Sequence, residues 1–394
     1  MVGRPARKQG TEKSFLFDWA ECAGAVGDLG VMVPIAVALI VTNGLTTTAV
    51  LLPAGLLYVI GGLVYRLPVP VQPLKAFGAI AIAHGFGPDE IAAGALLMGM
   101  IFVVLGGSGL LDRVAQVFPQ PIIRGIQLSV GLLFCRLSWK LVSKTPNAFA
   151  DHKYSACWLV VATLSVIAAA LIFRRRKITL LLVVVAVVAT VLRFHGSVAF
   201  GPSAVHVPHL RLAVFASAAV ALVLPQVPLS FANSCLATAD TARAYFGDAA
   251  HRVRPGRLAI TIGLANLFAG GISGMPVCHG AGGMTAHRVF GARSGGAPVM
   301  LGSVVLALAL VLGATTTAAL SGFPIPILAG LLMVAGLLHI TLLKDLRLPA
   351  HWALAVTVGI VGFLSNLAFA LVGALAVWWL VGAIRLKFAD RTTA

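Results

Sequence analysis

Residues 67–78 read Leu67-Pro68-Val69-Pro70-Val71-Gln72-Pro73-Leu74-Lys75-Ala76-Phe77-Gly78 and lie inside a long apolar sequence. Proline suits the first turn of a helix, where its missing N–H group costs nothing, so a short helix is expected to begin beside Lys75. A lysine is unfavourable there, because a helix start already carries positive charge and a charge at membrane depth is costly. A bound anion would reverse both penalties, since the N–H groups of residues 74–77 and the ammonium would contact it together. The segment therefore predicts a small-anion site inside a membrane protein.

The composition indicates a membrane protein without a soluble catalytic domain. Of the 394 residues, 59% are hydrophobic and 10% are charged, which is not typical of a soluble domain of this length. Apolar runs of membrane-spanning length recur along the chain, so the lipid bilayer is an expected partner. The net charge of +17 is spread over short loops, where orientation signals belong, and nucleic acid is not expected to bind. The five cysteines show no metal-ligand spacing and are expected to be small buried hydrophobes.

The apolar runs divide into about fourteen transmembrane segments between residues 17 and 385, of which the third (71–85) and the tenth (278–290) are short. With the N-terminus in the cytoplasm, most Lys and Arg residues fall on the cytoplasmic side, as membrane proteins require. We therefore expect an all-α multi-pass protein of the inner (plasma) membrane with both termini cytoplasmic. No pattern typical of a catalytic, metal or cofactor site is present, so we expect a protein that is not an enzyme.

An internal repeat supports this topology. A shift of 208 residues places Gly55-Leu56 on Gly263-Leu264, Gly62 on Gly270 and Pro68-Val69 on Pro276-Val277. An odd number of spans separates the two copies, so they cross the membrane in opposite directions. Inverted repeats with paired broken helices are typical of secondary transporters, whose site lies at the repeat interface. The alternative is chance similarity between apolar segments that contain Gly and Pro.

The two short segments and the eighth span supply the expected substrate site. Small residues at the start of the second short helix leave its backbone N–H groups open to a ligand, although they also suit tight helix packing. In the eighth span, Gln226, Ser230 and Asn233 share one helical face and either donate to an oxyanion or bond a neighbouring helix. The candidate substrate-binding residues are Gln72, Lys75, Gln226, Asn233, His279, Gly280, Ala281, Gly282 and Gly283.

Three titratable residues are candidates for coupling transport to protons or for organising the site. Glu21 and Asp28 lie seven residues apart in the first span and so share a face, and intramembrane carboxylates are usually functional. Asp28 would pair with Lys75 when the site is empty, or else with a neighbouring helix, whereas Glu21 is alternatively a membrane-surface residue. His279 would donate to the substrate or carry a proton. The other histidines, such as His206 and His209, are interpreted as loop or interface residues.

Three motifs resemble those of the molybdate transporter family, which is related to the sulfate permeases. They are Gly24-Ala25-Val26-Gly27-Asp28-Leu29-Gly30, Pro68-Val69-Pro70-Val71-Gln72-Pro73-Leu74-Lys75 and Pro276-Val277-Cys278-His279-Gly280-Ala281-Gly282-Gly283. The resemblance covers nearly the whole chain and implies uptake of the tetrahedral molybdate dianion by alternating access. It also implies a seven-plus-seven inverted repeat in which a core domain moves against a gate domain. The core would comprise residues 17–111 and 211–319, the gate residues 112–210 and 320–394, and residues 1–16 a cytoplasmic tail.

Several alternatives share this fold. Sulfate and tungstate have the charge and shape of molybdate, whereas a nucleobase would favour a buried carboxylate or aromatic walls over a lysine. An anion channel could use the same site, and saturation of the flux would distinguish the two. A membrane-embedded enzyme would need clustered nucleophiles or metal ligands, which the sequence does not show. The superfamily resemblance also suggests a homodimer.

Overall fold

The computed structural model describes residues 15–111, 113, 117–172 and 178–392, and the chain is almost entirely helical there. Two short strands, β1 (Gln72–Pro73) and β2 (Val277–Cys278), form the only sheet of this described part. The helices before β2 are α1 (Trp19–Ala25), η1 (Val26–Asp28), α2 (Leu29–Asn43), α3 (Thr47–Tyr65), α4 (Lys75–His84), α5 (Pro88–Ser108), α7 (Gln120–Ser143), η2 (Ala150–Lys153), α8 (Ala156–Ile172), α9 (Ile178–Arg193), α10 (Leu212–Ala218), η4 (Ala219–Val223), α11 (Leu224–Leu229), η5 (Ser230–Ala237), α12 (Thr238–Phe246), η6 (Gly247–Arg252) and α13 (Pro255–Gly271). The helices after β2 are α14 (Ala281–Phe290), α15 (Gly296–Val311), α16 (Gly313–Ala319), η7 (Leu320–Gly322), α17 (Ile325–Ile340), η8 (Thr341–Asp345), α18 (Pro349–Leu364) and α19 (Leu367–Thr392).

Several of these helices have the length and hydropathy of membrane spans. Among the described residues five helices meet both criteria, and the number is seven if each of two bent helix pairs is one span. Four shorter apolar helices of 10–17 residues add to them. The chain is therefore a multi-pass helical protein, while the count of fourteen spans stays a prediction.

The eighth predicted span is part of a longer helix with an irregular backbone. It runs without a break from Leu212 to Arg252, over 41 residues. The segments η4 and η5, on either side of α11, have π-helical hydrogen bonding. Pro225 and Pro228 lie in α11 between them, and each proline removes a backbone donor from the helix. The widened turns on both sides of α11 are the structural result.

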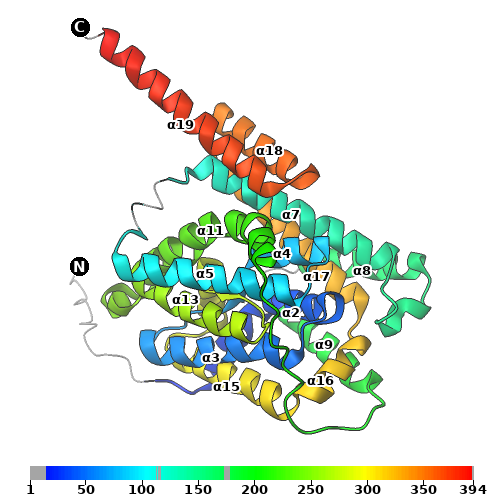
Figure 1. Ribbon diagram of the computed structural model, residues 1–394. Coiled ribbons are helices and arrows are strands. Elements are labelled where there is room, and N and C mark those ends of the chain that lie inside the picture. Colours follow the sequence, from blue (N-terminus) through cyan, green and yellow to red (C-terminus); the bar gives the residue numbers. More distant parts are fainter. Residues whose placement is uncertain (1–14, 112, 114–116, 173–177, 393–394) are drawn as a thin grey trace, which may run out of the picture.

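Paired glycines let the helices of the two repeats cross closely. Helix α5 packs along α13, and α3 packs along α15 (Figure 1). A Cβ atom on Gly302 would lie 2.8 Å from the carbonyl oxygen of Gly55, and one on Gly263 would lie 2.9 Å from that of Gly99. Gly55 and Gly263 occupy equivalent places in the repeat, so the two crossings are symmetry-related. Side chains at these positions would force the helices apart.

The helices form two groups. The first contains the crossed pairs of α3, α5, α13 and α15, and the second contains α7, α8, α17 and α18, which pack on one another. In the second group a Cβ atom on Gly131 would lie 2.7 Å from the carbonyl oxygen of Gly336, so α7 and α17 also cross at paired glycines. The short helix α4 contacts α7, and α2 contacts α17, which joins the two groups.

Candidate functional site

The two short helices begin at one common point. Strand β1 pairs antiparallel with β2, with Gln72 opposite Cys278, and the amide of Leu74 donates to the carbonyl oxygen of Pro276 at 3.1 Å. Helix α4 begins at Lys75, directly after β1, and α14 begins at Ala281, shortly after β2. The structure therefore brings the residues around 72–75 and 279–283 together, and the positive ends of two helix dipoles share one region.

Equivalent residues of the two repeats fix the strands before the short helices. The hydroxyl of Tyr58, in α3, donates to the carbonyl oxygen of Val71 at 2.8 Å. Asn266, in α13, bonds both backbone groups of Val277, at 2.9 and 2.8 Å. Tyr58 and Asn266 are 208 positions apart, which is the shift of the repeat. In both repeats a polar side chain of a long helix thus hydrogen-bonds to the backbone at the strand.

A cavity of about 460 Å³ lies beside the two helix starts, between the segments α2, α4, η5 and α14 and the helices α7 and α17. Its lining includes Gln72, Lys75, Gln226, Asn233, Ser234, Cys278 and Gly282 on one side and Gln127, Leu331, Val334, Ala335, Leu338 and His339 on the other. Among the described side chains of this lining, Lys75 is the one with a permanent charge, and none is a carboxylate. The electrostatic character of the cavity favours an anion.

Gln226 bridges the eighth span and the first short helix. Its side-chain oxygen accepts from the Phe77 amide at 3.0 Å, and its side-chain nitrogen donates to the Ser230 hydroxyl at 2.9 Å. The Phe77 and Leu74 amides are therefore bonded within the protein, although both were expected to face the ligand. Among the described residues, nothing accepts from the amides of Lys75 and Ala76. These two N–H groups are the donors that α4 offers.

Gly280 provides the space in which two amide side chains meet. Its backbone is extended, with φ −165° and ψ 134°. A Cβ atom there would collide with the side-chain oxygen of Gln72 and would lie 3.3 Å from the side-chain nitrogen of Asn233. Gln72 from β1 and Asn233 from η5 thus converge on the start of α14. The amides of Ala281, Gly282 and Gly283 form the first turn of that helix, where no intrahelical acceptor exists.

His279 does not line the cavity. Its Nδ1–H donates to the carbonyl oxygen of Pro70 at 2.8 Å, and its Nε2 lies 3.1 Å from the Thr261 hydroxyl. The ring is fully buried and packs edge-on against Tyr65. His279 thereby links the peptide before β1 to the start of α14, which is a positioning contact.

Glu21 also lies away from the cavity. Its carboxylate accepts from the Arg293 amide at 2.7 Å and from the Ala297 amide at 3.2 Å. Ala297 is in the first turn of α15, so this buried carboxylate caps that helix and ties it to α1. The side chain of Asp28 lies outside the described residues.

Two polar residues of the lining escaped the sequence reasoning. Gln127 accepts from Arg124 at 2.8 Å, and Arg124 forms an ion pair with Asp345. His339, near the end of α17, donates its Nδ1–H to the carbonyl oxygen of Ala335 at 2.8 Å. His339 is a single polar residue in the apolar helix α17, so its only signal was the cost of a polar group at membrane depth. Gln127 lies among other polar and charged residues of α7, which hid it.

The helix arrangement, with a cavity whose one permanently charged described side chain is a lysine, is that of a membrane transporter of anions. A comparison with protein families agrees. The chain belongs to the family described as "Molybdate transporter of MFS superfamily", whose model matches residues 20–134 and 218–338. Both matched blocks contain one of the short helices.

Curated relatives are transporters from plants and algae. The chain is 32% identical to "Molybdate transporter 1" of Arabidopsis thaliana, over 80% of this chain and 78% of that protein. It is 29% identical to "Molybdate transporter 2" of the same species, over 83% of this chain and 79% of that protein. It is 27% identical to "Molybdate transporter 1" of Chlamydomonas reinhardtii, over 86% of each.

Solved structures share the fold at low sequence identity. The transmembrane domain of the cyanobacterial bicarbonate transporter BicA superposes with a TM-score of 0.63 at 16% identity, over 90% of this chain and 97% of that one. Murine Solute Carrier 26 family member A9, an anion transporter in the inward-facing state, superposes with a TM-score of 0.67 at 17% identity, over 95% of this chain and 69% of that one. These likenesses confirm the predicted all-α inverted-repeat fold.

Proposed function

We propose that this chain takes up molybdate as a secondary active transporter that works by alternating access. The observation that carries the proposal is the convergence of two helix N-termini and Lys75 on one cavity without a described carboxylate. A tetrahedral dianion needs donors from several directions, and backbone N–H groups at helix starts supply them. The molybdate transporters among the relatives favour this anion over sulfate.

In the proposed complex the anion lies at the starts of α4 and α14. The amides of Lys75 and Ala76 donate from one side, and those of Ala281 to Gly283 from the other. The Lys75 ammonium balances part of the charge, and the side-chain amides of Gln72 and Asn233 complete the set of donors. Gln226 and His279 act through their bonds to Phe77 and Pro70, which hold the two helix starts in place. Glu21 acts at one remove, because it ties α1 to the start of α15.

The place of the cavity between the segments that hold the donors and the helices α7 and α17 supports alternating access. Its far wall comes from α7 and α17, while the donors come from α4, η5 and α14. Movement of the donor segments against α7 and α17 would expose the anion first to one side of the membrane and then to the other. In this proposal the core comprises residues 17–111 and 211–319 and the gate residues 112–210 and 320–394, in a plasma-membrane homodimer with cytoplasmic termini.

Uptake of radiolabelled molybdate into liposomes that contain the purified chain tests the substrate. We expect saturable uptake that unlabelled tungstate inhibits strongly, because tungstate presents the same tetrahedral dianion. Sulfate is expected to inhibit weakly and uracil not at all, with empty liposomes as the control. If sulfate inhibits uptake at lower concentrations than tungstate does, the preferred substrate is sulfate and not molybdate. A flux that does not saturate would indicate a channel.

Proton coupling is the part of the proposal that rests on titratable groups. Because the Nδ1–H of His339 is bonded to Ala335, a neutral ring presents the lone pair of Nε2 to its surroundings, and a protonated ring presents a donor. Protonation would therefore favour an anion beside Lys75 at the same cavity. Glu21 and His279 remain candidates as organising groups, because each is bonded within the protein.

An imposed pH gradient distinguishes these roles. We expect an inward proton gradient to accelerate molybdate uptake by the parent chain, and we expect His339→Gln to remove this acceleration. The exposed residue His251, in η6, gives the matched control, His251→Gln, which should respond like the parent. Parent uptake that ignores the gradient would rule out proton symport, and an unchanged response in His339→Gln would place the coupling elsewhere.

A further inference from the structure

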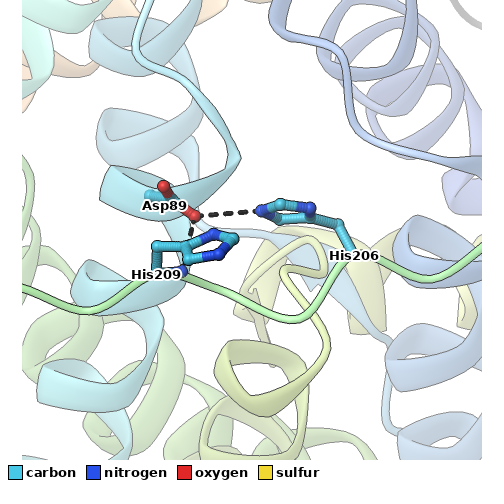
Figure 2. A group of neighbouring side chains, drawn as sticks. All are labelled: Asp89, His206 and His209. Carbon is cyan, nitrogen blue, oxygen red and sulfur yellow. Dashed lines mark hydrogen bonds and ion pairs between the residues drawn. The ribbon is translucent and has the colours of Figure 1, made fainter.

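Three potential metal ligands gather at the start of α5, although two of them are more than 100 residues from the third. Asp89 lies in the first turn of α5, and His206 and His209 come from the extended segment that links α9 to α10 (Figure 2). Nε2 of His206 lies 3.1 Å from Oδ1 of Asp89, and the two imidazole rings lie 5.6 Å apart between centroids. One ligand atom from each residue falls within 4.8 Å of the others.

The linker is fixed to the protein just before these histidines. Gly201 exchanges backbone hydrogen bonds with Val311 and Ala314, at 2.8 and 3.3 Å. Ser203 and Thr48 bond each other twice, through amide and hydroxyl groups, at 2.8 and 2.9 Å. The segment that carries His206 and His209 is therefore placed over α5 by contacts that do not involve the histidine rings.

The contacts within the cluster leave the ring of His209 available. It is the backbone amide of His209 that donates to Oδ1 of Asp89, at 3.0 Å. Among the described residues, no hydrogen bond is made by the His209 ring. A simple ion pair between His206 and Asp89 would not require a second imidazole beside it, whereas a metal ion would use both rings and the carboxylate.

We propose that Asp89, His206 and His209 form a binding site for a zinc-like divalent transition metal, which fastens the α9–α10 linker to α5. Two imidazole nitrogens and one carboxylate oxygen are a ligand set of zinc sites, with the fourth position left for water. Zinc requires bond lengths of about 2.0–2.2 Å, so binding would draw the two exposed histidine rings and the half-buried Asp89 carboxylate closer together. Calcium and magnesium are not expected to bind, because they prefer oxygen ligands throughout.

Spectroscopic titration with Co²⁺ tests the site on the full chain, purified in detergent without a histidine tag. We expect saturable visible absorption typical of bound Co²⁺, which Zn²⁺ displaces. The double variant His206→Ala/His209→Ala should lose this signal. Asp89→Asn should weaken Co²⁺ binding by about 10-fold or more, since even the loss of a residue that only supports a metal ligand has an effect of that size. His195→Ala removes an exposed histidine of the same linker and should titrate like the parent.

Further measurements distinguish loss of the metal site from loss of folding. Each variant is also compared with the parent by circular dichroism and by gel filtration in detergent, which show whether it is folded. Identical Co²⁺ titrations for the parent and the double variant would overturn the proposal, as would a parent chain that binds no Co²⁺ or Zn²⁺. The result does not depend on molybdate being the transported anion, because metal binding is the measured quantity.

Discussion

Replacing Lys75 by methionine is expected to abolish molybdate uptake and to weaken molybdate binding by about 10- to 150-fold. This range corresponds to the loss of one charged hydrogen bond of about 1.5–3 kcal/mol, at tenfold per about 1.4 kcal/mol. Methionine keeps the unbranched chain of lysine up to the Cε position and removes the ammonium, with its charge and donors. Lys75 is the one permanently charged side chain among the described residues of the cavity, so no neighbour replaces it.

Thermal unfolding with and without molybdate provides the measurement. Molybdate should raise the unfolding temperature of the parent, because a ligand that binds the folded state stabilises it, and this rise should be lost in Lys75→Met. Without molybdate the variant should be as stable as the parent or more stable, since an ammonium at a helix start is unfavourable. Lys140→Met, at an exposed position near the end of α7, is the matched control. An unchanged molybdate-induced shift in Lys75→Met would exclude Lys75 from the site.

The sequence located the candidate site because the unfavourable residues that mark it are close together along the chain. Two prolines and one lysine within a few residues, inside apolar sequence, are hard to accommodate without a ligand. The repeat then predicted the second helix start, near Gly280, and the structure brings both starts to one point. The inverted-repeat fold followed from the same motifs, because they recur at a fixed shift with opposite direction.

The direction of individual side chains could not be predicted in this way. His279 stands at a helix start, yet its ring turns to Pro70 and Thr261. Glu21 lies in apolar sequence, but its carboxylate accepts hydrogen bonds from two backbone amides at and just before the start of α15, which is distant in sequence. These partners are set by tertiary packing, which spacing along one helix does not contain. For the same reason the position of His339 in the cavity could not be predicted, because a single polar residue in an apolar helix forms no periodic pattern.

Replacing Gly280 by alanine should reduce molybdate binding about as much as the loss of Lys75, although it removes no polar group. Strain of the backbone is not the reason, because its φ of −165° is accessible to any residue. The added methyl group would displace the buried side chain of Gln72 and press on Asn233. Such overpacking costs about 1–3 kcal/mol in a tightly packed interior, and here it moves two of the proposed donors away from the start of α14.

Gly107→Ala is the matched control, because a Cβ atom there meets no heavy atom within 4 Å. Equilibrium binding of radiolabelled molybdate to both variants gives the comparison, and circular dichroism establishes that their helix content equals that of the parent. A larger side chain should strengthen the effect, so Gly280→Val should bind more weakly than Gly280→Ala. Binding by Gly280→Ala that matches the parent would show that Gln72 and Asn233 do not have to converge there, and the anion would then depend on Lys75 and backbone amides alone.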